Sequence, residues 1–240
     1  MKLSLSIGLN YVQAPWMALS GCCEDARDWN DFLQAHGFFS SLIVDDGVSA
    51  FRATRAGILK AIMDMLSSAR EGDLVVITYA GHGTQVKDSG GEADGLDECL
   101  VPPDASTSGL IKDDTLAEIF SAFKHLKIRL IFDCCHSGTM ADLKYNYLPE
   151  GTVRENSETS AVLGDIICMS GCRDSQYSYE ANGQGAFTGA ALGLLWTTPS
   201  LLDDVLVLHK RIHNKVRARF PKQHVMLSSS LLITDQAPLV

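Results

Sequence analysis

The sequence has no apolar run long enough to cross a membrane, which takes about 20 consecutive apolar residues as a helix. Its start, MKLSLSIGLNYV, carries one lysine and no small-residue cleavage site, so we interpret it as a strand rather than a signal peptide. No internal repeat, low-complexity tract or linker is visible in the 240 residues. These absences predict one domain over residues 1–240 and no membrane partner.

The cysteines lack the pattern of a disulfide framework. There are seven, an odd number, and two pairs are sequence neighbours, Cys22–Cys23 and Cys134–Cys135. Neighbouring cysteines rarely bridge each other, because disulfide geometry needs Cα atoms that face across a gap. Frameworks of this kind belong to small secreted domains. We therefore expect free thiols and a reducing, cytoplasmic setting.

Positive charge is not in excess either. The formal net charge is −9 at pH 7, so non-specific binding to nucleic acid is not expected. The dinucleotide-binding pattern G-x-G-x-x-G is also absent. Hydrophobic residues make up 46% and charged residues 20%, which is the composition of a globular protein with a sizeable core.

Strands are expected to alternate with helices along the chain. The runs LVVITYA (74–80) and IRLIF (128–132) have the continuous β-branched and aromatic character of strands buried on both faces. Other strands are expected at 3–9, 41–44, 165–170 and within 224–234, helices at 22–35, 52–69, 114–125, 187–197 and 201–218, a long loop or small hairpin at 84–112, and a mobile loop at 139–160. This alternation predicts an α/β fold with a mostly parallel central sheet flanked by helices on both faces.

Two of these strands end in residues with reactive side chains. Strand 74–80 is followed by His82, and strand 128–132 is followed by Cys135. Sites in open α/β sheets form beyond the carboxyl ends of the strands, so neighbouring strands would bring His82 and Cys135 together. A thiol is mostly protonated at neutral pH, and a nearby imidazole can take that proton. The pair predicts catalysis with Cys135 as nucleophile and His82 as acid/base partner.

The glycines beside His82 have a predicted role as well. Gly81 and Gly83 allow a sharp turn and a close approach of the backbone to a substrate. The amides of Gly83 and Cys135 are candidates for an oxyanion hole, where preorganised donors meet developing negative charge. Taken alone, His82 reads as an ordinary loop histidine and Cys135 as a small buried apolar residue. Their joint position at two strand ends favours catalysis.

Eight segments along nearly the whole chain form a recognisable series. They are LSGCCEDA (19–26), ATRAGILKAI (53–62), ITYAGHGTQ (77–85), DGLDECLVP (94–102), IKDDTL (111–116), IFDCCHSGT (131–139), MSGCRDSQ (169–176) and HVMLSSS (224–230). In this order they resemble the metacaspase and orthocaspase branch of the caspase-like peptidases. In this family the nucleophile directly precedes His-Ser-Gly, which selects Cys135 over Cys134. The resemblance implies a caspase-hemoglobinase fold and the activity of a cysteine-type endopeptidase.

The resemblance also implies cleavage after Arg or Lys. Family positions that shape the pocket for this P1 side chain map onto Cys22, Asp25 and Asp133. A cationic side chain needs carboxylates in its pocket, and Asp133 lies close to Cys135 in the sequence. Read alone, Asp25 is equally a solvated first-turn helix residue and Asp133 a turn former. Ala80 stands where many metacaspases have serine, which puts the shape of the pocket in question but not its charge.

A second acidic set resembles the calcium site of the family. Asp97, Asp113 and Asp114 match its positions, and Asp142 stands where the family more often has glutamate. Calcium prefers several oxygen ligands and tolerates irregular geometry. The resemblance therefore implies regulation by calcium. The alternative is a solvated acidic surface in which Asp113 or Asp114 caps a helix.

The expected partners are peptide or protein substrates with basic P1 residues, and the expected state is a monomer. Because exposed flexible segments are nicked most readily, self-cleavage is predicted after Lys144 or Arg154, with Lys87 as a third site. Two other functions stay open. One is a caspase-like peptidase with another P1 preference and no calcium requirement. The other is a catalytically silent caspase-like adaptor, against which the intact His82 and Cys135 argue.

Overall fold

The computed structural model of the chain describes residues 1–47, 52–87, 96–135, 143–156, 164–172, 180–181, 183–234 and 237–240. The strands are β1 (Lys2–Gly8), β2 (Phe39–Val44), β3 (Leu74–Ala80), β4 (Gly83–Lys87), β5 (Leu96–Leu100), β6 (Ile111–Lys112), β7 (Lys127–Asp133), β8 (Tyr145–Tyr147), β9 (Val153–Glu155), β10 (Asp165–Ser170), β11 (Glu180–Ala181), β12 (Gln184–Gly185) and β13 (Met226–Ser229). The helices are α1 (Cys22–Ala35), α2 (Arg55–Ser68), α3 (Ala105–Ser108), α4 (Asp113–Ser121), α5 (Ala186–Thr197) and α6 (Val205–Arg219), with short 3-10 helices at Pro15–Met17 and Pro199–Asp203.

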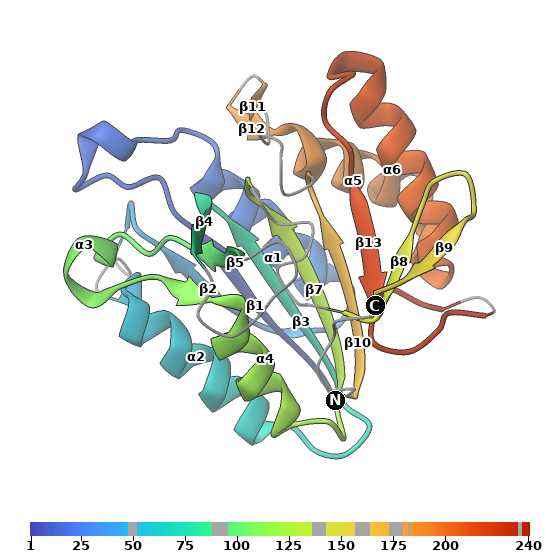
Figure 1. Ribbon diagram of the computed structural model, residues 1–240, viewed down its shortest axis with the longest axis horizontal. Helices are drawn as coiled ribbons and strands as arrows, with labels where there is room; N and C mark the ends of the chain where they lie inside the picture. Colours follow the sequence, from blue (N-terminus) through green and yellow to red (C-terminus); the bar gives the residue numbers. More distant parts are fainter. Residues whose placement is uncertain are drawn as a thin grey trace.

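The central sheet has eight strands in the order β2-β1-β3-β7-β10-β13-β8-β9 (Figure 1). The first five strands in this order are parallel to one another, and the last three are added in antiparallel pairs. A smaller antiparallel sheet, β4-β5-β6, begins one residue after His82. The predicted α/β fold with a mostly parallel central sheet is confirmed.

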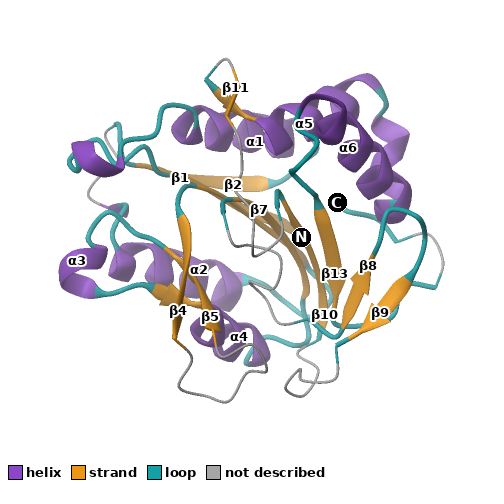
Figure 2. Ribbon diagram, turned by 45° about the horizontal axis from the view of Figure 1, so that its top comes forward, coloured by secondary structure: helices purple, strands orange, loops and turns teal. Residues whose placement is uncertain are grey.

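Helices cover both faces of the central sheet. Figure 2 shows α1, α5 and α6 on one face and α2, α3 and α4 on the other. Ile77 and Tyr79 of β3 belong to the buried cluster on the α2 and α4 side, whereas Val76 belongs to the cluster on the α1, α5 and α6 side. Successive strand residues point to opposite faces, so a strand that is apolar at every position can be buried on both.

Capping residues set the helix boundaries. The Asp204 carboxylate accepts hydrogen bonds from the amides of Leu206 and Val207, both at 3.1 Å, and α6 begins directly after it. Such a cap satisfies amides that have no partner inside the helix. The predicted helix at 201–218 is therefore wrong at its start, because the cap separates a 3-10 helix from α6.

No helix within the described ranges is long and apolar enough to cross a membrane.

The segment 139–160, predicted as a mobile loop, contains two strands in its described part. β8 pairs with β13, with Tyr147 opposite Leu227, and β9 pairs with β8. Each of these strands has only three residues, which is too short to show an alternating pattern in the sequence. Their stability comes from the partner strand. The loop prediction is wrong at these residues. For residues 84–112 the sequence predicted a long loop or a small hairpin. The hairpin is confirmed, because β4 and β5 form an antiparallel pair.

Acid is expected to destabilise the fold through His209 of α6. This side chain is 2% exposed, and its Nε2 lies 3.0 Å from the carbonyl oxygen of Val225. Burial lowers the pKa of His209 to about 4. The unfolded chain takes up this proton near pH ~6.5 and the folded chain only near pH ~4, so stability should fall as pH drops through that window, by at most about 3 kcal/mol.

The variant His209→Gln keeps a donor for Val225 and removes the titration. Its free energy of unfolding in urea should depend less on pH than that of the wild type. An unchanged pH dependence in His209→Gln would contradict the assignment.

Candidate active site

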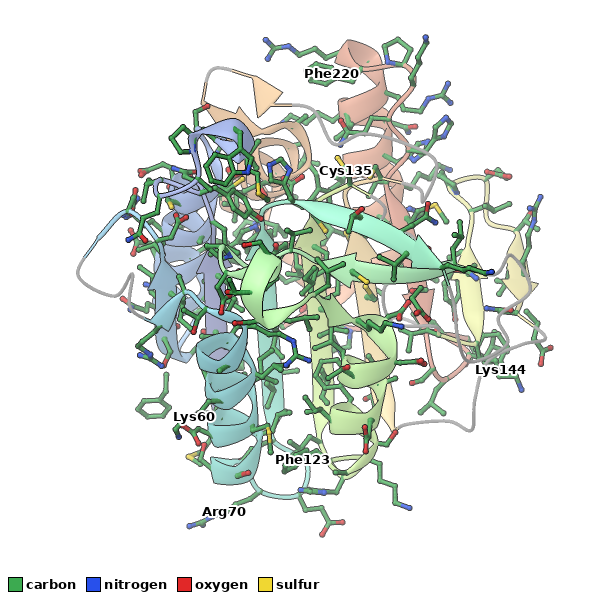
Figure 3. The ribbon with its side chains drawn as sticks, turned by 60° about the vertical axis from the view of Figure 1, so that its left-hand side comes forward. Lys60, Arg70, Phe123, Cys135, Lys144 and Phe220 are labelled. Atoms are coloured by element: carbon green, nitrogen blue, oxygen red, sulfur yellow. The ribbon has the colours of Figure 1, made fainter. Side chains whose placement is uncertain are left out.

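β3 and β7 are neighbours in the sheet and end together. They pair in parallel, with Ala80 opposite Asp133. His82 follows β3 and Cys135 follows β7, so the chain carries both residues out of the sheet at its carboxyl edge. Figure 3 labels Cys135 at this end of the molecule, opposite the end where Arg70 follows α2. The prediction for His82 and Cys135 required the two strands to be neighbours, and β3 and β7 are neighbours.

The two strand ends approach closely at Gly83. A Cβ atom at Gly83 would lie 1.9 Å from the carbonyl oxygen of Cys135 and 3.3 Å from the Sγ of Cys134. Only a residue without a side chain permits this approach. The backbones of the two predicted oxyanion-hole residues, Gly83 and Cys135, are therefore in direct contact.

Cys135 differs from the other cysteines in its exposure. It is half-buried, whereas Cys134 and the remaining five are buried. Burial disfavours a thiolate; it raises the pKa of Cys168, for example, to about 12. A nucleophile must be reachable and able to ionise. The exposure of the thiols thus favours Cys135 over Cys134.

A backbone carbonyl orients the imidazole of His82. The Nε2 of His82 lies 2.8 Å from the carbonyl oxygen of Met17, in the 3-10 helix that precedes α1. A carbonyl oxygen only accepts, so in the neutral imidazole Nε2 carries the proton and Nδ1 can take one up. The sequence offered no signal for Met17, because any residue at that position supplies a carbonyl.

Two tyrosine hydroxyls hold the backbone of His82. Its amide donates to the Oη of Tyr11 at 2.7 Å, and its carbonyl accepts from the hydroxyl of Tyr79 at 2.9 Å. The Tyr11 ring also packs beside the imidazole, with ring centroids 4.7 Å apart. Sequence reasoning missed both tyrosines. For Tyr79 the available signal was a phenol near the end of a buried strand, two residues before Gly81.

The predicted pocket residues Asp25 and Asp133 come together from distant parts of the chain. Asp25 lies in the first turn of α1 and Asp133 at the end of β7, and both are buried. A Cβ atom at Gly185 would lie 2.8 Å from the Oδ2 of Asp25 and 2.2 Å from the Oδ2 of Asp133. Both carboxylates therefore face the same glycine. Cys22, the third predicted pocket residue, is buried in the same turn as Asp25.

Main-chain and hydroxyl donors orient the two carboxylates. The amide of Gly185 donates to both oxygens of Asp25, at 3.2 and 3.0 Å. Thr188 donates to the Oδ2 of Asp133 from its amide at 3.0 Å and from its hydroxyl at 2.8 Å. The start of α5 thus fixes this acidic pair, and the sequence alone did not indicate Gly185 or Thr188.

Two buried carboxylates that face one point repel each other. Coulomb repulsion is strong where water is excluded, and a cation between the two groups relieves it. The pair therefore suits a cationic ligand group better than a neutral one. A cavity of about 270 Å³ has Gly185, Lys215 and Arg219 in its lining but neither Asp25 nor Asp133, so its basic lining suits such a group poorly.

The predicted calcium ligands lie on the small β4-β5-β6 sheet and the helix that follows it. Asp97 of β5 is fully buried and forms an ion pair through Oδ2 with Lys112 of β6. Its other oxygen, Oδ1, is buried and has no hydrogen-bond partner among the residues that the structure describes. The pairing with Asp97 raises the pKa of Lys112. The Lys112 ammonium thus already pairs with Asp97, the first of the predicted calcium ligands.

The remaining predicted ligands differ in their exposure and in their partners. Asp113 is fully buried and accepts from the amides of Glu98 at 2.9 Å and Asp114 at 2.8 Å, while Asp114 itself is exposed at the start of α4. Asp142 lies outside the described residues. Within the described part of the chain, no group of three or more acidic, histidine or cysteine side chains is arranged to hold a metal ion. Asp97 and Asp113 carry oxygen ligands of the kind that calcium prefers, but the Lys112 ammonium already pairs with one oxygen of Asp97.

Comparison with known proteins identifies the class. Residues 2–144 match the family model described as metacaspase, peptidase C14 domain. The chain is 33% identical to Metacaspase-3 of Trypanosoma brucei brucei, over 97% of this chain and 72% of that protein. It is also 33% identical to Metacaspase-2 of the same organism, over 79% of this chain and 59% of that protein. The chain belongs to the metacaspase family and is a cysteine-type peptidase of the caspase-like class.

Solved structures show the same fold. Protein GSU0716 from Geobacter sulfurreducens has a TM-score of 0.74 to this chain at 25% identity, covering 99% of this chain and 98% of that one. Caspase-1 from Spodoptera frugiperda has a TM-score of 0.61 at 16% identity, covering 96% of this chain and 86% of that one. The caspase-type fold implied by the sequence resemblance is therefore confirmed.

The choice between the adjacent cysteines can be tested by substitution. Cys135→Ala should abolish cleavage of reporter peptides and keep the wild-type melting temperature, because this thiol is half-buried at a strand end. Cys134→Ala should retain most activity and lose about 1 kcal/mol of stability, because removal of its buried sulfur leaves a small cavity. A thiol-directed peptide inhibitor, located by mass spectrometry, should label Cys135. A label on Cys134 would reverse the assignment.

Proposed function

We propose that the protein is an endopeptidase that cleaves after Arg or Lys, with Cys135 and His82 as its catalytic pair. The observation that carries this proposal is the convergence of the Asp25 and Asp133 carboxylates on Gly185. Asp133 ends β7 and Cys135 follows two residues later, so the acidic pair lies close to the candidate nucleophile. A P1 guanidinium or ammonium would neutralise two buried negative charges there.

The reaction would proceed in two steps. The Nδ1 of His82 takes the thiol proton of Cys135, and the thiolate attacks the carbonyl carbon of the P1 residue. The amides of Gly83 and Cys135 stabilise the resulting oxyanion, and His82 returns its proton to the leaving amine. The product is a thioester on Cys135. Water, deprotonated by His82, then hydrolyses this thioester and regenerates the thiol.

The acidic pair makes a direct prediction. Asp25→Asn and Asp133→Asn keep an oxygen acceptor for their backbone donors and remove the charge. Each should lower kcat/KM for an Arg reporter by about two to three decades, because loss of one partner from a desolvated charge pair costs ~2–5 kcal/mol. A reporter with a neutral P1 residue should change far less.

Asp28→Asn is the matched control, since Asp28 lies on the same helix and accepts from the Nε2 of Gln184 at 2.8 Å. It should leave kcat/KM for the Arg reporter near the wild-type value. If both Asp25→Asn and Asp133→Asn also leave Arg cleavage intact, the P1 pocket lies elsewhere.

We further propose that calcium regulates the enzyme through Asp97 and Asp113, with Asp114 and Asp142 as the other family positions. Supporting this, a buried oxygen of Asp97 has no hydrogen-bond partner within the described residues, which is unfavourable unless a further ligand binds. Calcium would bind the carboxylates and displace the Lys112 ammonium. A second candidate, a peptidase of the same class with no calcium requirement, is favoured by the Lys112–Asp97 ion pair, which already supplies a cation.

Removal of the lysine separates these two candidates. Under the calcium proposal, Lys112→Met should lower the calcium Kd about tenfold in isothermal titration calorimetry, which corresponds to roughly 1.4 kcal/mol. Lys60→Met, which breaks an exposed ion pair with Asp64 on α2, should bind calcium like the wild type. No binding heat in the wild type or in Lys112→Met would exclude calcium. Equal affinity in both would exclude competition by Lys112.

Self-cleavage after Lys144 or Arg154 remains part of the proposal, with a structural condition. The carbonyl of Lys144 accepts from the amide of Asn156 at 2.7 Å, and its ammonium pairs with Glu155 at 2.9 Å. Arg154 lies in β9, opposite Asn146 of β8. A peptidase binds its substrate as an extended, unpaired chain, so either cut requires the β8–β9 hairpin to open. Lys87 is exposed at the end of β4, but it is paired with Leu96 of β5, so a cut there requires the end of β4 to separate from β5.

A further inference from the structure

A closed ring of hydrogen bonds surrounds the backbone of His82. The His82 amide donates to the Oη of Tyr11 at 2.7 Å, and the Tyr11 hydroxyl donates to the carbonyl of Val101 at 2.8 Å. The Val101 amide in turn donates to the carbonyl of His82 at 3.1 Å. Every donor in the ring has an acceptor, as buried polar groups require. The ring ties the turn after β3 to the residue that follows β5.

Tyr79 adds a second contact to the same residue. Its hydroxyl donates to the His82 carbonyl at 2.9 Å and lies 3.3 Å from the Oη of Tyr11. Burial raises the pKa of both Tyr11 and Tyr79 well above the ordinary value, so both hydroxyls keep their protons. With one proton each, the two hydroxyls donate over their shortest contacts, Tyr11 to Val101 at 2.8 Å and Tyr79 to His82 at 2.9 Å, and the Tyr79 hydroxyl also lies 3.4 Å from the Val101 carbonyl oxygen.

Gly81 leaves the space that these hydroxyls occupy. A Cβ atom at Gly81 would lie 2.7 Å from the Oη of Tyr79 and 3.0 Å from the Oη of Tyr11. Any larger residue directly before His82 would push at least one hydroxyl out of the ring. The glycine that the sequence indicated for a sharp turn therefore has a second reason to be there.

Tyr11 adopts a backbone conformation that is unusual for a large residue. Its φ is 57°, in the left-handed region. The Asp45 carboxylate holds this conformation by accepting from the amides of Tyr11 at 2.5 Å and Asn10 at 2.8 Å, and from the Cys23 thiol at 3.2 Å. Strained residues persist where their surroundings fix them, and they concentrate at functional sites.

The segment that carries Tyr11 also supplies the carbonyl that orients the imidazole. The Ala14 amide donates to the Tyr11 carbonyl at 2.8 Å, and the Met17 amide donates to the Ala14 carbonyl at 2.8 Å. These two turns connect Tyr11, which holds the His82 backbone, to Met17, which holds the His82 ring. One short segment between β1 and α1 thus fixes both parts of the same residue.

We propose that Tyr11 is a positioning residue that aligns His82 with Cys135 through its hydroxyl, and that Asp45 acts through Tyr11. This rests on the proposed role of His82 as the base. Without the Tyr11 hydroxyl, the amide of the half-buried His82 loses its acceptor and the ring opens. The imidazole then no longer points its Nδ1 reliably at the thiol, while the substrate pocket around Gly185 is untouched.

The test compares Tyr11→Phe with a matched control, Tyr147→Phe. Tyr147 is also buried, and its hydroxyl also accepts from a backbone amide, that of Ile233 at 2.7 Å, but it lies in β8. Alkylation of Cys135 by iodoacetamide is followed from about pH 5 to about pH 9, because its rate reports the thiolate. Cys135 is the one cysteine of the chain that is not buried, so the label is readily assigned.

For Tyr11→Phe we expect the alkylation rate near neutral pH to fall about tenfold and its pH profile to move towards that of an ordinary thiol. With an Arg reporter, kcat should fall by a similar factor and KM should stay within about twofold. Tyr147→Phe should lower the melting temperature only. Asp45→Asn, which keeps one acceptor oxygen, should shift the profile in the same direction by less, and it replaces Tyr11→Phe if that variant does not fold.

A Tyr11→Phe profile that coincides with the wild-type profile would overturn the positioning role while leaving the catalytic pair intact. An equal shift in Tyr147→Phe would also overturn it, since the effect would then be a general loss of stability. If the wild-type thiol already titrates like an ordinary cysteine, the catalytic pair itself fails, and the positioning role fails with it.

Discussion

The parallel pairing of β3 with β7 is the constraint on which the candidate site depends. It places Ala80 opposite Asp133, so the chain leaves the sheet at two adjacent points and carries His82 and Cys135 with it. Because side chains alternate between the faces of a strand and both strands are buried on both faces, a shift of register by one residue would exchange the side chains that pack in the two buried clusters. The positions of the reactive residues are thus fixed by burial of the sheet rather than by contacts of their own.

The contacts that refine this arrangement come largely from backbone atoms. The Met17 carbonyl orients the His82 ring, the Val101 backbone closes the ring of hydrogen bonds, and the Gly185 amide orients Asp25. Groups held by secondary structure need no reorganisation when charge develops, which is the physical basis of preorganised catalysis. Gly83 contributes to this preorganisation, because its lack of a side chain lets its backbone contact that of Cys135.

Much of this fold could be predicted from the sequence. The bounds of β3, β10 and α1 match the prediction, because continuous apolar runs and an amphipathic pattern mark buried elements directly. β8 and β9 could not be found in this way, because β8 is stabilised by pairing with β13 and β9 by pairing with β8, not by a pattern in their own sequences. The ends of two predicted strands indicated His82 and Cys135, and the family resemblance selected Cys135 over Cys134 and indicated the carboxylates. It could not indicate Met17 or Gly185, which act through main-chain atoms, or the ion pair that Lys112 makes with Asp97.

The most direct test of the site is a crystal structure of the protein inactivated by a peptide chloromethyl ketone with Arg at P1. We expect a thioether bond to the Sγ of Cys135, the imidazole of His82 beside it, and the guanidinium between the carboxylates of Asp25 and Asp133. A thioether on Cys134, or an arginine side chain bound away from Asp25 and Asp133, would contradict this account of the site.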